Sequence, residues 1–506
     1  QKINHHRVKM YKPSRQLLRV LKVAQNNSVR RYASNVTSQN TPIQQFRAAS
    51  SSEPVVTPSY DLPEFLTKSP PTQITTLSNG VRVVSEPRVG ETAAVGVFIK
   101  AGSRQENKSN NGVAHFLEHM YFKGTKKRNS HQLELEFENA GALLNAHTAR
   151  EYTAFSSHCL KNDVERSVDA LADILLNSDL KDADIERERG VILRESEEVS
   201  QNIEEVLYDE LHATAYQQSS LGFTILGSEQ NIRSITRKQM VDYRDTFYTA
   251  PRMTLIGVGD IDHAKLVSLG EKYFGGVATA PALGKSDKTE HPSYLGSDVR
   301  IFNEDIPNLH MAIAFEGPGI ASADTLVISL IQLLLGSYDK TMGAGKFVSP
   351  NLANLVAENE LARLLVPFNH AYSDTGLFGV KTISDGGDNT DTLMCEIIHH
   401  MTRLCYRIQP EDLERAKNIF KSQILSQYEG GLRGVLEEIG RNTLFYGRRP
   451  SAAEMFARID AITAEDVKRV ATKYIYDQDP VLSAIGKTEN MVDYTWLRTF
   501  TTAWRV

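Results

Sequence analysis

Two histidines and a glutamate at close spacing form the most reactive arrangement in this chain. His115, Glu118 and His119 lie within residues 112–125, GVAHFLEHMYFKGT, and spell H-x-x-E-H. This is the reverse of the H-E-x-x-H box of zinc peptidases. Residues i and i+4 project from one face of an α-helix. The two histidines can therefore hold one metal ion, with Glu118 beside them as a general base. The alternative is a helix with two histidines beside a salt-bridged glutamate.

A third ligand is available farther along the chain. The spacing of apolar residues predicts one helix over 184–216, opened by Asp184 at its N-cap. Glu188 and Glu195 lie on the apolar stripe of this helix, seven residues apart. Carboxylates on an inward face are costly unless they are paired or bound to a metal. Pairing with three neighbouring arginines is the alternative. Those arginines lie off the stripe, which favours a metal site with three protein ligands.

Three blocks of the sequence resemble the inverted-zincin peptidases of the pitrilysin family. They are HFLEHMYFKGT (115–125), LNAHTAREYTAF (144–155) and RERGVILRESEEV (187–199). In that family the third ligand is a glutamate 76 residues after the second histidine, which is Glu195 here. The resemblance extends roughly over residues 72–500. It implies one zinc ion per chain, held by His115, His119 and Glu195, with Glu118 as general base. Glu188 would orient one of the histidines.

The resemblance also implies residues that contact a peptide substrate. Residues 144–149 and 152–156 alternate as strands, and an edge strand could bind a peptide by β-augmentation. The matching family pair, Asn145 and Ala146, contacts the substrate backbone, although Asn145 could be a turn residue. Phe122 matches a residue that lines the pocket after the scissile bond, although it could equally belong to the core.

Two acidic residues match the family's acceptors for a substrate arginine. Glu205 and Asp209 are expected to continue the helix of Glu195 and to face the same cleft. A solvated charged face is the alternative.

The expected activity is that of a zinc metalloendopeptidase that removes N-terminal targeting presequences from imported mitochondrial proteins. In the resembling members a metal-binding subunit works with a glycine-rich α subunit, which lacks H-x-x-E-H. Residues 337–352, SYDKTMGAGKFVSPNL, lack the long glycine-rich run of that partner. The chain is therefore expected to be the catalytic subunit of a heterodimer, with basic presequence peptides as substrates. The alternative, from another functional class, is a structural core protein of the respiratory bc1 complex.

The N-terminal segment has the composition of a mitochondrial targeting presequence. Residues 1–52 contain ten Lys or Arg and no acidic residue. Arg30-Arg31-Tyr32-Ala33 resembles a presequence cleavage pattern, which predicts a presequence over 1–32 and a Ser/Thr/Pro-rich linker over 33–72. The expected location is the mitochondrial matrix, or the matrix face of the inner membrane within the bc1 complex. A nucleic-acid-binding tail is disfavoured, because no basic patch continues into the body.

The body of the chain contains an internal duplication. Residues 184–187 resemble 412–415, and the strand at 253–259 resembles 481–486, both at an offset near 228. We predict an α+β fold of two homologous halves, each a β-sheet with helices packed on one face. Residues 73–280 would be the catalytic zinc-binding domain and 298–506 its homologue without metal. Three cysteines form no C-x-x-C pair, and no apolar run reaches the ~20 residues of a membrane helix.

Overall fold

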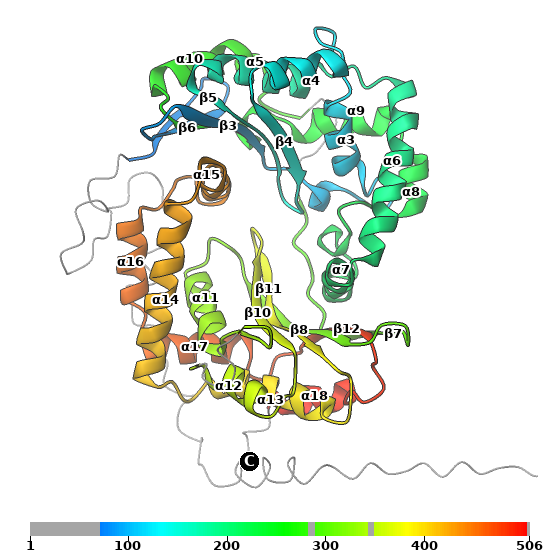
Figure 1. Ribbon diagram of the computed structural model, residues 1–506, viewed down its shortest axis with the longest axis vertical. Helices are drawn as coiled ribbons and strands as arrows, with labels where there is room; N and C mark the ends of the chain where they lie inside the picture. The colour runs from blue at the N-terminus through cyan, green and yellow to red at the C-terminus, as the bar shows by residue number, and fades with distance from the viewer. Residues whose placement is uncertain (1–70, 282–288, 343–348, 503–506) are drawn as a thin grey trace, which may run out of the picture.

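Two six-stranded sheets, each with helices packed on it, make up the computed structural model of the chain (Figure 1). The structure describes residues 71–281, 289–342 and 349–502. The predicted presequence, and all of the predicted linker except residues 71 and 72, lie outside the described residues. In the described part of the chain, no helix is both long enough and apolar enough to cross a membrane.

The first sheet has the strand order β1-β2-β6-β3-β5-β4. Its strands are β1 (Gln73–Thr76), β2 (Arg82–Pro87), β3 (Thr92–Ile99), β4 (Leu143–Thr148), β5 (Thr153–Leu160) and β6 (Met253–Gly259). A tight turn at Asn79-Gly80 joins β1 to β2, and Gly80 takes the positive φ of 99° that this turn requires. β4 pairs only with β5, so it is the edge strand next to the predicted metal helix.

Eight helices of the first half belong to the described residues. They are α3 (Val113–Tyr121), α4 (Ser130–Asn139), α5 (Val164–Asn177), α6 (Asp182–Gln201), α7 (Ile203–Ala215), α8 (Glu229–Ser234), α9 (Arg237–Phe247) and α10 (His263–Phe274). α5 and α10 pack on one face of the sheet. The alternate β3 residues Ala93, Val95, Val97 and Ile99 lie in the core on this face, whereas Ala94 and Phe98 point to the opposite face.

The second sheet repeats this plan, with the order β7-β12-β8-β11-β10-β9. Its strands are β7 (Asp298–Phe302), β8 (Leu309–Pro318), β9 (Tyr338–Asp339), β10 (Leu364–Ala371), β11 (Thr375–Ser384) and β12 (Val481–Gly486). Its helices are α11 (Asp324–Leu335), α12 (Asn351–Glu358), α13 (Thr390–Arg403), α14 (Pro410–Tyr428), α15 (Leu432–Tyr446), α16 (Ala452–Asp460), α17 (Ala464–Tyr474) and α18 (Tyr494–Phe500).

The order of elements along the chain matches the two halves to each other. In each half a strand leads to two helices, α3 and α4 or α11 and α12, and then to a hairpin, β4–β5 or β10–β11. The next long helices also correspond: α6 to α14 and α7 to α15. This arrangement confirms the predicted α+β class and the internal duplication.

Each half covers the inner face of the other half's sheet with one helix. Leu207 and Leu211 of α7 pack on the second sheet, and Val435 and Leu436 of α15 pack on the first (Figure 1). A Cβ on Gly440 of α15 would lie 2.4 Å from the ring of Phe98, so glycine permits this close approach. The two halves therefore contact each other through two separate apolar clusters, one on each sheet.

The prediction of a single helix over 184–216 is wrong. The segment forms α6 and α7, which are separated at Asn202 (φ −83°, ψ 95°), and Figure 1 shows α7 turned away from the axis of α6. The Asn202 side chain accepts a hydrogen bond from the backbone N–H of Glu204 at 3.2 Å and so caps α7. α6 begins at Asp182 with Lys181 as its N-cap, so Asp184 lies in the first turn rather than at the cap.

Candidate metal centre

The helix that carries H-x-x-E-H is fixed at its start by a buried carboxyl group. Gly112 is the N-cap of α3 with a φ of 99°, and a Cβ there would lie 2.4 Å from the Leu226 carbonyl oxygen. The Glu106 carboxyl accepts hydrogen bonds from the backbone N–H groups of Gly112 (2.9 Å) and Ala114 (2.7 Å). Burial raises the pKa of Glu106 to about 8, against the opposing effect of these N–H donors. Sequence reasoning missed Glu106, because it lies nine residues before the first histidine of the motif.

Three potential ligands converge between α3 and α6. His115 Nε2 lies 3.6 Å from Glu195 Oε1, and His119 Nε2 lies 3.3 Å from Glu195 Oε2. One ligand atom from each residue lies within 4.8 Å of the others. Within the described residues, this is the one such group of three or more His, Cys, Asp or Glu side chains. The tertiary structure thus brings Glu195 to the two histidines from 76 residues away.

These donor atoms fit a tetrahedral zinc ion. Ligand atoms about 2.0–2.1 Å from one zinc ion lie roughly 3.3–3.4 Å apart at tetrahedral positions. Glu195 Oε2 is shielded from solvent but has no hydrogen bond, so a buried acceptor is left unsatisfied. Two imidazole nitrogens and a carboxylate oxygen are also ligands that zinc accepts. His115 and then His119 lower the pKa of Glu195, which keeps this carboxylate charged and ready to bind a cation.

Glu188 contacts the second histidine from the side away from Glu195. Its side chain is only 4% exposed, and Oε2 lies 3.4 Å from His119 Nδ1. Lys123 Nζ lies 2.8 Å from the other carboxylate oxygen. The predicted pairing of this carboxylate with a histidine therefore has a geometric basis, and its ion-pair partners among the described residues are His119 and Lys123 rather than the neighbouring arginines. Arg187 pairs with Asp184 instead.

The carboxylate of Glu118 is directed toward the edge strand. Thr148 Oγ1 on β4 donates a hydrogen bond to Glu118 Oε2 at 2.5 Å. Glu118 lies one residue before the ligand His119 and is half-buried. The predicted base is therefore held between the donor cluster and the strand that could bind a peptide. The contact from Thr148 is tertiary, and the motif did not predict it.

The two predicted backbone-binding residues lie on that edge strand. Asn145 and Ala146 are in β4, opposite Ser156 and Phe155 of β5, so Asn145 is a strand residue rather than a turn residue. Among the described strands none pairs with the outer edge of β4. Phe122 follows α3 as its C-cap and packs partly buried against the first core. Its predicted role in a substrate pocket stays a prediction.

The two predicted arginine acceptors have different surroundings. Glu205 is exposed and accepts a hydrogen bond from Asn202 Nδ2 at 2.9 Å. Asp209 is bound to the chain's own Arg150, with Nη2 and Oδ1 2.7 Å apart. Both acids lie on α7, beyond the break at Asn202, so the distances expected from one continuous helix do not apply. Arg150 comes from the turn between β4 and β5 and could not be anticipated from the acidic pattern.

Two family models match consecutive parts of the chain. The chain matches the family model described as Insulinase (Peptidase family M16) over residues 82–229 and that described as Peptidase M16 inactive domain over residues 234–420. The first match contains all three potential ligands and Glu118.

Several relatives share more than two fifths of their residues with the chain. The probable mitochondrial-processing peptidase subunit beta of Arabidopsis thaliana is 45% identical over 85% of this chain and 81% of that protein. The mitochondrial-processing peptidase subunit beta of Neurospora crassa is 46% identical over 84% of this chain and 90% of that protein. The subunit beta of Homo sapiens is 43% identical over 85% of this chain and 87% of that protein.

Two solved structures share the fold. A chain of complex III2 from Candida albicans, bound to Inz-5, superimposes with a TM-score of 0.77 at 24% identity, over 85% of this chain and 99% of that one. A protease from Helicobacter pylori gives a TM-score of 0.73 at 22% identity, over 82% and 99%.

Proposed function

The chain belongs to peptidase family M16, and on this basis we propose that it is a zinc metalloendopeptidase that cleaves targeting presequences from imported mitochondrial proteins. The observation that carries the proposal is the convergence of His115, His119 and Glu195, with the carboxylate of Glu118 beside them. The names of the relatives support the substrate class.

His115, His119 and Glu195 would hold the zinc ion. When bound, zinc supplies Lewis acidity that polarises a peptide carbonyl and makes water a stronger acid. Glu118 Oε2 would take a proton from the attacking water and deliver it to the leaving nitrogen. The Thr148 hydroxyl orients that carboxylate, and Glu188 holds His119 through Nδ1.

A substrate peptide would lie extended on the free edge of β4. There Asn145 and Ala146 would contact its backbone, and Phe122 would line the pocket after the scissile bond. Glu205 and Asp209 would receive an arginine upstream of the cut. In this proposal residues 73–280 form the catalytic domain, and residues 298–506 form a homologous domain without metal.

The proposed setting is the mitochondrial matrix, with a glycine-rich α subunit as partner. The name of the relatives, mitochondrial-processing peptidase subunit beta, supports a heterodimer. The sequence of residues 337–352 also supports this partnership, because it lacks the long glycine-rich run of the α subunit. Residues 343–348 of this segment lie outside the described residues. A role as a core protein of the bc1 complex is the second candidate, and co-purification from mitochondria with respiratory subunits would identify it.

The decisive experiment separates ligands from base. Glu118→Gln should keep one zinc ion per chain by elemental analysis while losing cleavage of a presequence peptide. His119→Ala and Glu195→Gln should lose both the zinc ion and the cleavage of the peptide. A zinc-free Glu118→Gln, or a fully active His119→Ala, would refute the assignment.

A second measurement tests the partnership. The isolated chain should process presequences poorly, and addition of the glycine-rich α subunit should restore activity. Equal rates for the isolated chain and the mixture would exclude the heterodimer.

A further inference from the structure

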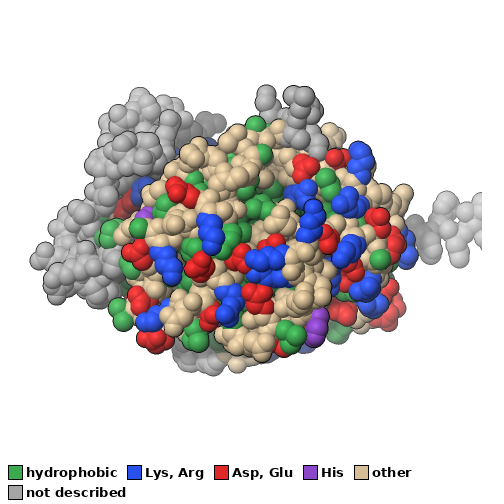
Figure 2. Space-filling view, turned by 90° about the horizontal axis from the view of Figure 1, so that it is seen from above, with side chains coloured by type: hydrophobic (Ala, Val, Ile, Leu, Met, Phe, Trp, Pro, Cys, Tyr) green, Lys and Arg blue, Asp and Glu red, His purple; other side chains and the backbone are tan. Residues whose placement is uncertain are grey.

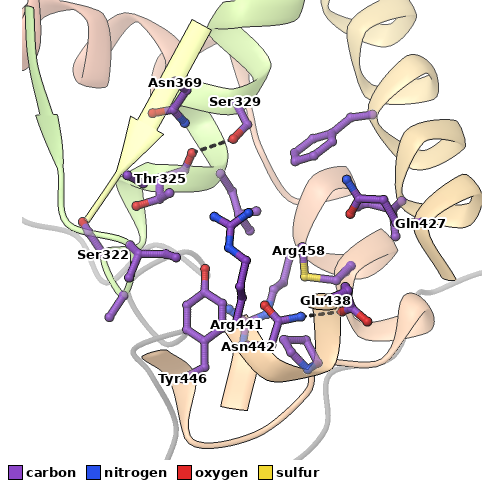
Figure 3. Close-up of a pocket in the computed structure, with 18 of the residues that line it drawn as sticks. Ser322, Thr325, Ser329, Asn369, Gln427, Glu438, Arg441, Asn442, Tyr446 and Arg458 are labelled. Atoms are coloured by element: carbon purple, nitrogen blue, oxygen red, sulfur yellow. Dashed lines mark hydrogen bonds between the residues drawn. The ribbon is translucent and has the colours of Figure 1, made fainter. Parts of the chain in front are cut away.

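A large cavity lies in the second half at the position that corresponds to the donor cluster of the first half. The cluster lies between α3 and α6 beside β4. The cavity lies between the corresponding elements α11 and α14, beside β10, and α15 closes it (Figure 3). Its volume of about 550 Å³ lies within the ~300–1,000 Å³ of small-molecule sites. None of the proposed zinc ligands lines this cavity.

Arg441 of α15 extends into the middle of the cavity, toward Thr325 on α11 (Figure 3). No hydrogen bond or ion pair identified among the described residues uses its guanidinium group, which carries five N–H donors. The other two arginines of the lining, Arg448 and Arg458, both bind Glu454, at 2.7 and 2.6 Å. Among the described residues, Arg441 is therefore the lining arginine whose N–H groups form no hydrogen bond or ion pair within the chain.

The two carboxylates of the lining are engaged elsewhere. Glu438 Oε2 lies 2.6 Å from Arg449, and Asn442 donates to its other oxygen. Glu437 Oε1 lies 3.6 Å from His147 of β4, at the side facing the first half. Neither carboxylate forms an ion pair with Arg441 among the described residues, although the charge of Arg441 acts on the carboxylate of Glu437. The N–H donors of Arg441 are therefore left for a ligand, whereas Glu438 is bound by Arg449 and Asn442.

The remaining polar lining consists of neutral groups. Hydroxyl groups come from Thr325, Ser329 and Tyr446, and amide groups come from Asn369 and Gln427. The hydroxyls of Thr325 and Ser329 already donate to backbone carbonyl oxygens, so the donors that would bind an oxyanion are Arg441, the Tyr446 hydroxyl and the two amides. Charge-assisted hydrogen bonds to arginine are strong and directional.

We propose that this cavity binds a small organic oxyanion, a carboxylate or phosphate compound of metabolite size, through Arg441. The opposite face of α15 packs on the first sheet through Val435, Leu436 and Ile439. An occupant would thus contact the helix that joins the two halves and would stabilise the folded chain by binding it preferentially.

The test uses the purified full chain with succinate and inorganic phosphate as probes and potassium chloride at equal ionic strength as the control. Either probe should raise the Tm saturably and give a Kd by calorimetry. Saturation by succinate alone identifies a carboxylate site, and saturation by phosphate alone identifies a phosphate site.

Arg441→Gln should weaken binding about 10- to 100-fold, as expected for the loss of a charged hydrogen-bonding partner. Arg433→Gln, which removes an exposed arginine of the same helix outside the cavity, should change the Kd less than about 2-fold. Tyr446→Phe removes a single hydroxyl group and should weaken binding several-fold, which provides a test that does not depend on the folding of Arg441→Gln. The proposal is overturned if neither probe saturates, or if Tyr446→Phe and a folded Arg441→Gln bind as the wild type does. The latter result would place the anion elsewhere, including at the metal centre.

Discussion

Replacement of Glu188 by glutamine should weaken zinc binding without removing a ligand. The buried carboxylate lies 3.4 Å from His119 Nδ1 and holds the ring with Nε2 toward Glu195. Loss of such a partner typically costs ~10–100-fold in metal affinity. A separation of 3.4 Å is longer than the usual 2.7–3.2 Å of a good N–H···O bond. We therefore expect a loss of zinc affinity at the lower end of this range, about 10-fold, or ~1.4 kcal/mol.

The assay is competition for zinc between the full chain and a chromophoric chelator. Lys123→Met is the matched control, because Lys123 binds the other oxygen of Glu188 at 2.8 Å and is not one of the proposed zinc ligands. It should change the zinc Kd less than about 3-fold, because it leaves the contact between Glu188 Oε2 and His119 Nδ1 in place. The double variant should resemble Glu188→Gln. Equal losses in both single variants would refute the reasoning, since Glu188 would then act by holding α6 to α3.

Two further predictions concern substrate charge and pH. Glu205→Gln with Asp209→Asn should lower kcat/KM about 10- to 100-fold for peptides with an upstream arginine, and much less for alanine analogues, at unchanged zinc content. Arg150→Gln breaks the same ion pair to Asp209 but keeps both acids, so an equal loss in that variant would contradict a direct role in binding substrate. The folded-state pKa of Glu106, about 8, exceeds its ordinary value of 4.5. The protonated carboxyl therefore contributes fully to the free energy of unfolding below about pH 4.5, and this contribution is lost as the pH rises through 8. The Tm of Glu106→Gln relative to wild type should therefore rise between about pH 5 and pH 8.5 in thermal unfolding, and a constant difference would show that Glu106 is ionised throughout.

Local periodicity was sufficient to predict the core of the site. His115 and His119 share a face because one helical turn separates them, and this spacing holds wherever the helix lies in the fold. Glu188 and Glu195 also had to share a face of α6, for the same reason. The duplication was visible because its two copies kept matching residues at a constant offset.

One local signal was present but missed. Asn202 followed by Glu205 is a helix-start pattern, a capping residue with an acid three positions later. The apolar spacing on both sides suggested continuity, whereas the Asn202 side chain caps a new helix. The proposed acceptors Glu205 and Asp209 consequently lie on a helix of different direction.

The tertiary structure alone decided which groups meet across long stretches of chain. Thr148 reaches Glu118, Arg150 reaches Asp209, and α7 and α15 each pack on the sheet of the other half. No local rule fixes such contacts, because they depend on how the sheets stack and where their edges meet. Spacing along the chain determined which residues could act together on one helix, and the packing of the two halves determined what surrounds them.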